Sequence, residues 1–79
     1  MRLRPQVLEE LGRHGVRPGP DEAPETLRER LNDVYLEDVR RLRERQVAGG
    51  IPLHDYARRV QDLKERYPLL GLPLSLWVE

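Results

Sequence analysis

The chain has 79 residues, no cysteine, and fourteen basic side chains balanced by fourteen acidic ones. This length allows one small domain, whose core stabilises the fold by only about 3 to 5 kcal/mol, and disulfides and thiolate metal sites are excluded. The balanced charge argues against a strongly basic nucleic-acid binder. The chain lacks an apolar run long enough for a secretory signal or a membrane-spanning helix. We therefore expect a cytoplasmic protein without membrane contact, for which oligomerisation is the remaining common source of extra stability.

A short helix is predicted over residues 5 to 13, because Pro5 suits a first helical turn and three apolar side chains share one face. That face carries Val7, Leu8 and Leu11. Gly12 and Gly15 are expected to end this helix. The stretch VRPGPDEAP that follows is rich in proline, which predicts a stiff linker over residues 15 to 23.

A long helix is predicted over residues 24 to 48, with Pro24 in its first turn and two glycines supplying its end. Acidic side chains fill its first half and arginines fill its second, an order that complements the helix dipole. At about 100° per residue, one stripe forms the expected buried face. That stripe contains Leu27, Leu31, Val34, Tyr35, Val39, Leu42 and Gln46.

A second long helix is predicted over residues 52 to 67, ending before Pro68. Its apolar positions follow the 3-4-3-4 spacing of a coiled-coil-like contact. These positions are Leu53, Tyr56, Val60, Leu63 and Tyr67. Folding the chain at Gly49 and Gly50 places them opposite the stripe of the first long helix, which predicts an antiparallel hairpin.

The run LRERQVAGGIPLHDYARRVQDLKE, residues 42 to 65, resembles the SHOCT type of short helical-hairpin module. The similarity consists of a helix, a glycine turn, an isoleucine, a polar helix start with an acid, and an aromatic residue. The matching positions are Leu42, Gly50, Ile51, Asp55, Tyr56 and Leu63. This resemblance implies a role in oligomerisation and carries no catalytic residues.

The C-terminal segment, residues 68 to 79, is apolar and alternates with a period of two, which is typical of an extended chain. It leaves the second long helix beside the unmatched start of the first. We expect it to cover Leu27 to Val34 together with the N-terminal helix. The alternatives are irregular coil on the helices or pairing with the same tail of a second subunit, and the orientation of Trp77 stays open between the core and a partner. The predicted fold is thus all-α and a single domain, residues 1 to 79: an antiparallel two-helix hairpin with a short N-terminal helix and an extended apolar tail.

Catalytic chemistry has little support in the residues present. His14 and His54 are forty residues apart, too far in sequence for a compact ligand set, and the pair His54 and Asp55 lacks the further ligands of a metal-dependent phosphohydrolase. Ser75 has no histidine near it in the sequence to activate it as a nucleophile. We expect no enzymatic activity, no cofactor and no metal.

An interaction surface is predicted from apolar residues that lie off the expected hairpin seam. Leu36 and Val47 are eleven residues apart, so they lie on nearly the same side of the long helix. Aromatic anchors often dominate interfaces, which adds the tail residue Trp77 to this surface. The full set is Leu36, Val47, Leu74, Leu76 and Trp77. The chain is therefore predicted to form a homodimer or to act as the small subunit of a partner protein.

The arginines support a different class of function, binding to the phosphates of a nucleic acid. The residues concerned are Arg40, Arg41, Arg43, Arg45, Arg58 and Arg59. On the second long helix, however, Asp55 to Arg59 and Asp62 to Arg66 are acid-first pairs at spacing i,i+4, which predicts local ion pairs instead. Nucleic-acid binding is the alternative to an interaction module.

Overall fold

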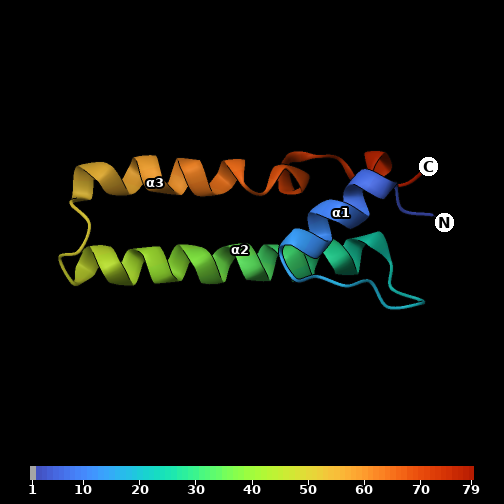
Figure 1. Cartoon of the computed structure of the whole chain (residues 1–79), viewed down its shortest axis with the longest axis horizontal. Coiled ribbons are helices and arrows are strands. Elements are labelled where there is room, and N and C mark those ends of the chain that lie inside the picture. The colour runs from blue at the N-terminus through green and yellow to red at the C-terminus, as the bar shows by residue number, and fades with distance from the viewer. Residues whose placement is uncertain (1) are drawn as a thin grey trace.

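The computed structural model describes residues 2–79 and confirms the predicted all-α class. Figure 1 shows α2 and α3 side by side, with α1 and the C-terminal segment gathered at one end of the pair. The elements are α1 (Pro5–Arg13), α2 (Pro24–Val47), α3 (Leu53–Glu65) and two short 3-10 helices, η1 (Pro68–Gly71) and η2 (Leu74–Leu76). The molecule is elongated, with extents of 46 × 18 × 16 Å.

Gly12, predicted to help end α1, lies within the helix. The end of α1 is set by Gly15, whose φ of 75° lies in the left-handed region that favours glycine. The amide of Val16 donates to the carbonyl of Leu11 at 2.9 Å, and that of Gly15 donates to the carbonyl of Gly12 at 3.1 Å. This pair of bonds is a Schellman motif, which brings an apolar residue after the helix back against its last turn. Val16 and Leu11 are accordingly both buried.

The turn between α2 and α3 uses the same device. Gly49 has a φ of 86°, and the amide of Gly50 donates to the carbonyl of Arg45 at 2.8 Å. A Cβ on Gly50 would lie 3.3 Å from that carbonyl, so a side chain there would crowd the turn. The chain reverses within a few residues, and Ile51 is buried at the turn.

Helices α2 and α3 pack against each other and run in opposite directions (Figure 1). Helix α3 is shorter at both ends than the predicted range 52 to 67. Leu53, predicted in the contact between the helices, is 71% exposed. Ile51, two residues earlier in the chain, is buried in its place. Leu53 therefore lies outside the contact, whereas Val60, a later position of the same predicted stripe, is half-buried.

The tail is not the extended segment that its alternation predicts. Pro68 and Pro73 each introduce a 3-10 helix, because proline fixes φ near the helical value and has no amide to donate. A 3-10 helix has about three residues per turn, so Leu74 and Trp77 share a side while Leu76 faces away. Trp77 is 0% exposed, and Leu76 is one of the exposed apolar residues. Trp77 therefore has the inward of the two orientations left open by the sequence.

The last residues of the tail pair with the first residues of the chain. Leu3 and Val78 form an isolated antiparallel β-bridge, with the amide of Arg4 donating to the carbonyl of Trp77 at 2.9 Å. The side chain of Arg4 also donates to the carbonyl of Val78, at 3.1 Å. The tail packs on the helices of its own chain, as the first of the two alternatives predicts, but as two short 3-10 helices and a β-bridge in place of irregular coil. The extended partner is the N-terminal segment of the same chain.

The linker between α1 and α2 is held by Glu22. Its carboxylate accepts the amide of Gly19 at 2.7 Å and the guanidinium of Arg30 at 2.6 Å, and Arg30 also donates to the carbonyl of Arg17. The hydrogen bond from Gly19, followed by that from Arg30, lowers the pKa of Glu22 below its ordinary value of 4.5. This network ties the linker to the side of α2.

The core lies at the end of the molecule where α1 and the tail cover α2. Its buried members are Val7, Leu11, Val16, Leu27, Leu31, Tyr67, Leu69 and Trp77. Leu8, predicted on the core face of α1, is one of the exposed apolar residues. Toward the turn, the α2–α3 contact consists of half-buried side chains such as Val39, Leu42 and Val60. The N-terminal helix and tail therefore complete the core at one end only.

Candidate interaction surface

The surface of α2 that faces away from α3 carries the most exposed apolar side chains of that helix. Leu36 is 52% exposed and Val47 is 74% exposed. They lie on one stripe, about 20° apart around the helix at 100° per residue. In Figure 1 no other element lies along this edge of α2 over its C-terminal half. We call this stripe the outer face of α2; it consists of Glu25, Glu29, Asp33, Leu36, Arg40, Arg43 and Val47.

Close to Val47 the outer face is shallowly hollowed. The hollow has a volume of about 320 Å³. It is lined by Arg40, Arg43, Glu44, Val47 and Ala48. Arginine stems are apolar along most of their length, so this hollow presents hydrocarbon framed by charge.

The tail contributes less to the surface than the sequence predicts. Trp77 is fully buried and donates its indole Nε1–H to the carbonyl of Leu72 at 3.2 Å. Leu74 is half-buried and packs against the same core. Their predicted interaction role is therefore wrong for Trp77 and reduced for Leu74, because core packing takes up both side chains. Leu76 is 45% exposed and is the one tail member of the predicted set that stays at the surface.

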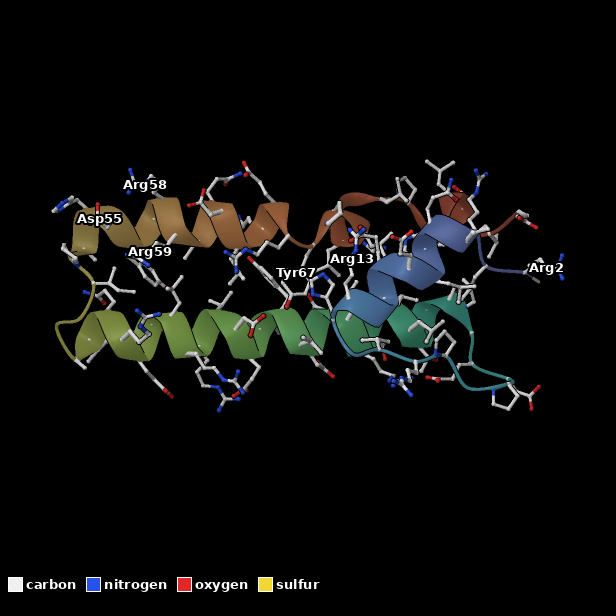
Figure 2. The ribbon with its side chains drawn as sticks, in the orientation of Figure 1. Arg2, Arg13, Asp55, Arg58, Arg59 and Tyr67 are labelled. Atoms are coloured by element: carbon white, nitrogen blue, oxygen red, sulfur yellow. The ribbon has the colours of Figure 1, made fainter. Side chains whose placement is uncertain are left out.

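The predicted arginine set is divided among three surfaces. Arg40 and Arg43 belong to the outer face of α2, and Figure 2 shows Arg58 pointing away from α2 and Arg59 pointing toward it. A groove of about 360 Å³ runs between α2 and α3. Its lining residues are Asp38, Arg41, Leu42, Arg45, Arg59, Asp62, Leu63 and Arg66. The groove gathers three of the six predicted arginines and adds Arg66, for which the sequence predicts a local ion pair with Asp62.

The ion pairs predicted along α3 do not form. Within residues 2–79, neither Asp55 with Arg59 nor Asp62 with Arg66 comes within salt-bridge distance, and Asp55 instead lies 3.6 Å from His54 Nε2. Figure 2 agrees, since Arg59 leans toward α2 and away from Asp55. Exposed pairs of this kind gain little free energy. The guanidinium groups on the α2 side of α3 are consequently available to other anions.

A polar and aromatic cluster joins α1, α2 and the end of α3 around Tyr67, which Figure 2 shows between the two long helices. The ring of His14 stacks on Tyr67 at 4.0 Å, and the ring of Tyr35 meets it edge-on at 5.3 Å. His14 Nε2 lies 2.8 Å from the carbonyl of Arg66, and the Tyr67 hydroxyl donates to the carboxylate of Asp38. Burial raises the pKa of the Tyr67 phenol, and the bond to Asp38 raises it further. The cluster thus keeps the phenol protonated and fixes three elements to one another.

The sequence predicts His14 and Tyr67 in separate elements and does not indicate that their rings stack. One signal was present: Asp38 lies on the same side of α2 as Leu31 and Leu42, where an acid interrupts an apolar stripe. A charged group on a buried stripe needs a hydrogen-bonding partner. The partner of Asp38 is Tyr67, which reaches it only after the chain has reversed between α2 and α3. The apolar periodicity of α2 alone does not predict that contact.

In residues 2–79, no group of three or more His, Cys, Asp or Glu side chains is placed to hold a metal ion. Over that range no helix combines the length and the apolar character needed to cross a membrane. Comparison with family models, with curated proteins and with solved structures gave no match to this chain.

Proposed function

We propose that this protein is an assembly module that associates with itself through the outer face of α2. The observation that carries the proposal is the exposure of Leu36 and Val47 on one stripe of a charged helix. Large apolar side chains exposed together on one face are typical of interaction sites. A small domain with a limited core also gains stability from association, because binding favours the folded state.

The completeness of the core supports this interpretation. Trp77 and Leu69 fill the capped end, and no side-chain nitrogen or oxygen buried within residues 2–79 lacks a hydrogen-bond partner. The tail therefore packs in the core and does not cover the exposed residues of the outer face. In this proposal the antiparallel hairpin of α2 and α3 is the rigid unit that presents the surface, and the tail serves the core.

Replacement of Leu36 by glutamate tests the proposed surface. We expect the dissociation constant of the self-complex to rise at least tenfold, because each copy would bury a carboxylate in place of about 1.5 to 3 kcal/mol of apolar burial. Sedimentation equilibrium on the full chain, at tens of micromolar, measures the association. Circular dichroism should show unchanged helicity, since Leu36 is outside the core.

Leu53→Glu is the matched control, because Leu53 is at least as exposed as Leu36 but lies at the start of α3, away from the outer face. An acid in a first helical turn is favourable, so this variant should fold and associate as the unchanged chain does. A wild-type chain that stays monomeric at these concentrations refutes the proposed function. Equal weakening by both substitutions would show that the outer face is not the interface.

A second candidate function is binding to a nucleic-acid backbone in the arginine-lined groove. The observation that favours it is the convergence of Arg41, Arg45, Arg59 and Arg66 from two helices on one groove. Guanidinium groups bind phosphates through two hydrogen bonds at once. Asp38 and Asp62 line the same groove and oppose such binding, which makes this the weaker candidate.

Salt-dependent binding decides between the two candidates. If the groove binds phosphates, affinity for mixed single-stranded and duplex nucleic acid should fall steeply with salt, and Arg59→Ala should weaken it by several-fold. Arg58→Ala is the control, because Arg58 points away from α2 in Figure 2 and should not contribute. The absence of binding in a low-salt fluorescence anisotropy titration would exclude the second candidate.

A further inference from the structure

The charges on the outer face of α2 are negative before Leu36 and positive after it. Glu29 precedes Leu36 by seven residues, and Arg43 follows it by seven. Nearer the centre, Asp33 lies before Leu36 and Arg40 after it. All four charged side chains are exposed, so each is accessible to another molecule. One half of the stripe is therefore acidic and the other half is basic.

Three of these four charges have no intrachain ion pair. Within residues 2–79, Arg40 pairs with Glu37 at 2.6 Å, whereas Glu29, Asp33 and Arg43 take part in none of the salt bridges. Elsewhere on α2, Arg30 and Arg41 each lie within 4.0 Å of an acid. Glu44 and Arg45 also take part in none of the salt bridges within residues 2–79, so the outer face is distinguished by the order of its charges. Unpaired charges of opposite sign thus occupy corresponding positions on either side of an exposed leucine.

We infer that the partner of the outer face is a second copy of this chain, bound antiparallel about a two-fold axis at Leu36. In that register Leu36 meets the partner's Leu36, and Glu29 meets the partner's Arg43. Val47 lies opposite the partner's Glu25, so Leu36 supplies the central apolar contact. By symmetry Arg43 meets the partner's Glu29, so the pair occurs twice. Asp33, three residues before Leu36, and the partner's Arg40, four residues after it, come near each other without the exact match of the outer pair, and Arg40 also pairs with Glu37 of its own chain. This interface is isologous, as closed dimers require.

The charges also select against the other orientation. In a parallel pair the symmetry would place Glu29 beside the partner's Glu29 and Arg43 beside the partner's Arg43. Like charges facing each other cost free energy and reject a wrong partner or register. Leu36 alone would allow either direction, since a single apolar contact has no polarity along the helix. The antiparallel orientation is therefore an electrostatic property of the stripe.

This inference rests on the proposed function, and cysteine cross-linking tests it separately because the natural chain contains no cysteine. Glu29→Cys and Arg43→Cys are prepared as full chains, mixed, and oxidised mildly. We expect the mixed disulfide between the two variants to exceed either self-disulfide by at least severalfold. Self-disulfides of each variant in excess of the mixed product would overturn the antiparallel register.

Charge reversal provides a second measurement that does not depend on thiols. Glu29→Arg and Arg43→Glu should each raise the dissociation constant about tenfold, because each converts two symmetric attractions into repulsions. The double variant, which exchanges the two charges, should return to near the wild-type value. Glu65→Arg and Arg58→Glu are the controls for these charge changes. Glu65 is the last residue of α3, and Arg58 points away from α2, so neither change should alter the dissociation constant.

The outcomes separate the two proposals. A monomeric wild-type chain removes the proposed function and the register together. If Leu36→Glu disrupts the dimer, the outer face is the interface. If the double variant Glu29→Arg with Arg43→Glu then associates as weakly as the two single variants, the antiparallel pairing is overturned. Restoration by the exchange, with the mixed disulfide in excess, supports both.

Discussion

Replacement of Trp77 by alanine is expected to lower the free energy of unfolding by about 3 to 5 kcal/mol, the range for removing a large buried aromatic side chain. Trp77 is 0% exposed and packs in the one core cluster that contains α1, α2 and the tail. For a chain whose core supplies only about 3 to 5 kcal/mol in total, a loss of this size removes most of the stability. We expect a largely unfolded population in urea titrations followed by circular dichroism.

Two variants show whether burial is the cause. Leu76→Ala lies next to Trp77 in the same 3-10 helix but is 45% exposed, so its effect should be within about 1 kcal/mol. Trp77→Phe keeps an aromatic ring and loses the hydrogen bond to the carbonyl of Leu72, so its effect should be intermediate. If Leu76→Ala is as damaging as Trp77→Ala, the tail does not pack as the structure shows.

Replacement of Tyr67 by alanine is expected to have the second largest effect, about 3 to 4 kcal/mol in the free energy of unfolding. The side chain is nearly buried and contacts three elements through His14, Tyr35 and Asp38. Tyr67→Phe retains both ring contacts and removes only the hydroxyl, which should cost about 1 to 2 kcal/mol because Asp38 loses its donor. Urea denaturation of the two variants separates packing from hydrogen bonding.

A double-mutant cycle identifies the partner of the hydroxyl. Asp38→Asn combined with Tyr67→Phe should cost less than the sum of the two single changes, since both remove the same bond. Additive effects would mean that the bond contributes nothing. Arg58→Ala, on the outer side of α3, serves as the control for an unrelated surface change.

The same bond predicts how stability responds to alkaline pH. Burial first, and the bond to Asp38 second, raise the pKa of Tyr67 above its ordinary value of 10.0. The folded chain therefore holds the phenolic proton more tightly than the unfolded chain does. The resulting contribution to stability is fully present below pH 10 and decreases as the pH rises above it. Tyr67→Phe should flatten this alkaline decrease in pH-dependent urea titrations.

The contacts that define the helices were predictable because they are local. Proline at the first turn, a glycine with positive φ after the last, and a stripe at 3.6 residues per turn each act over a few residues. The predicted range of α1 agrees with the structure at both ends, and α2 starts as predicted but ends one residue earlier. Helix α3 starts one residue later and ends two residues earlier than predicted. Leu36 and Val47 were identified by the same local geometry, as the apolar residues of α2 that its periodic stripe leaves out.

The tail was misread because two local signals conflict there. Alternation of leucines suggests an extended chain, whereas Pro68 and Pro73 favour tight turns, and the turns prevailed. The difference matters for function, since a period of three moves Trp77 from the predicted surface into the core. The edge partner of Val78 was equally hidden, because Leu3 lies seventy-five residues away along the chain.

The all-α class, the helix boundaries and the polarity of charge along α2 follow from the order of residues, because each depends on neighbours within one or two helical turns. The burial of Trp77, the bond between Tyr67 and Asp38, and the closure of the two chain ends depend on segments that meet only after the chain has reversed twice. Such meetings are decided by the competition among all elements for one small core. Trp77 is buried in that core, whereas Leu36 and Val47 stay exposed on the outer face of α2.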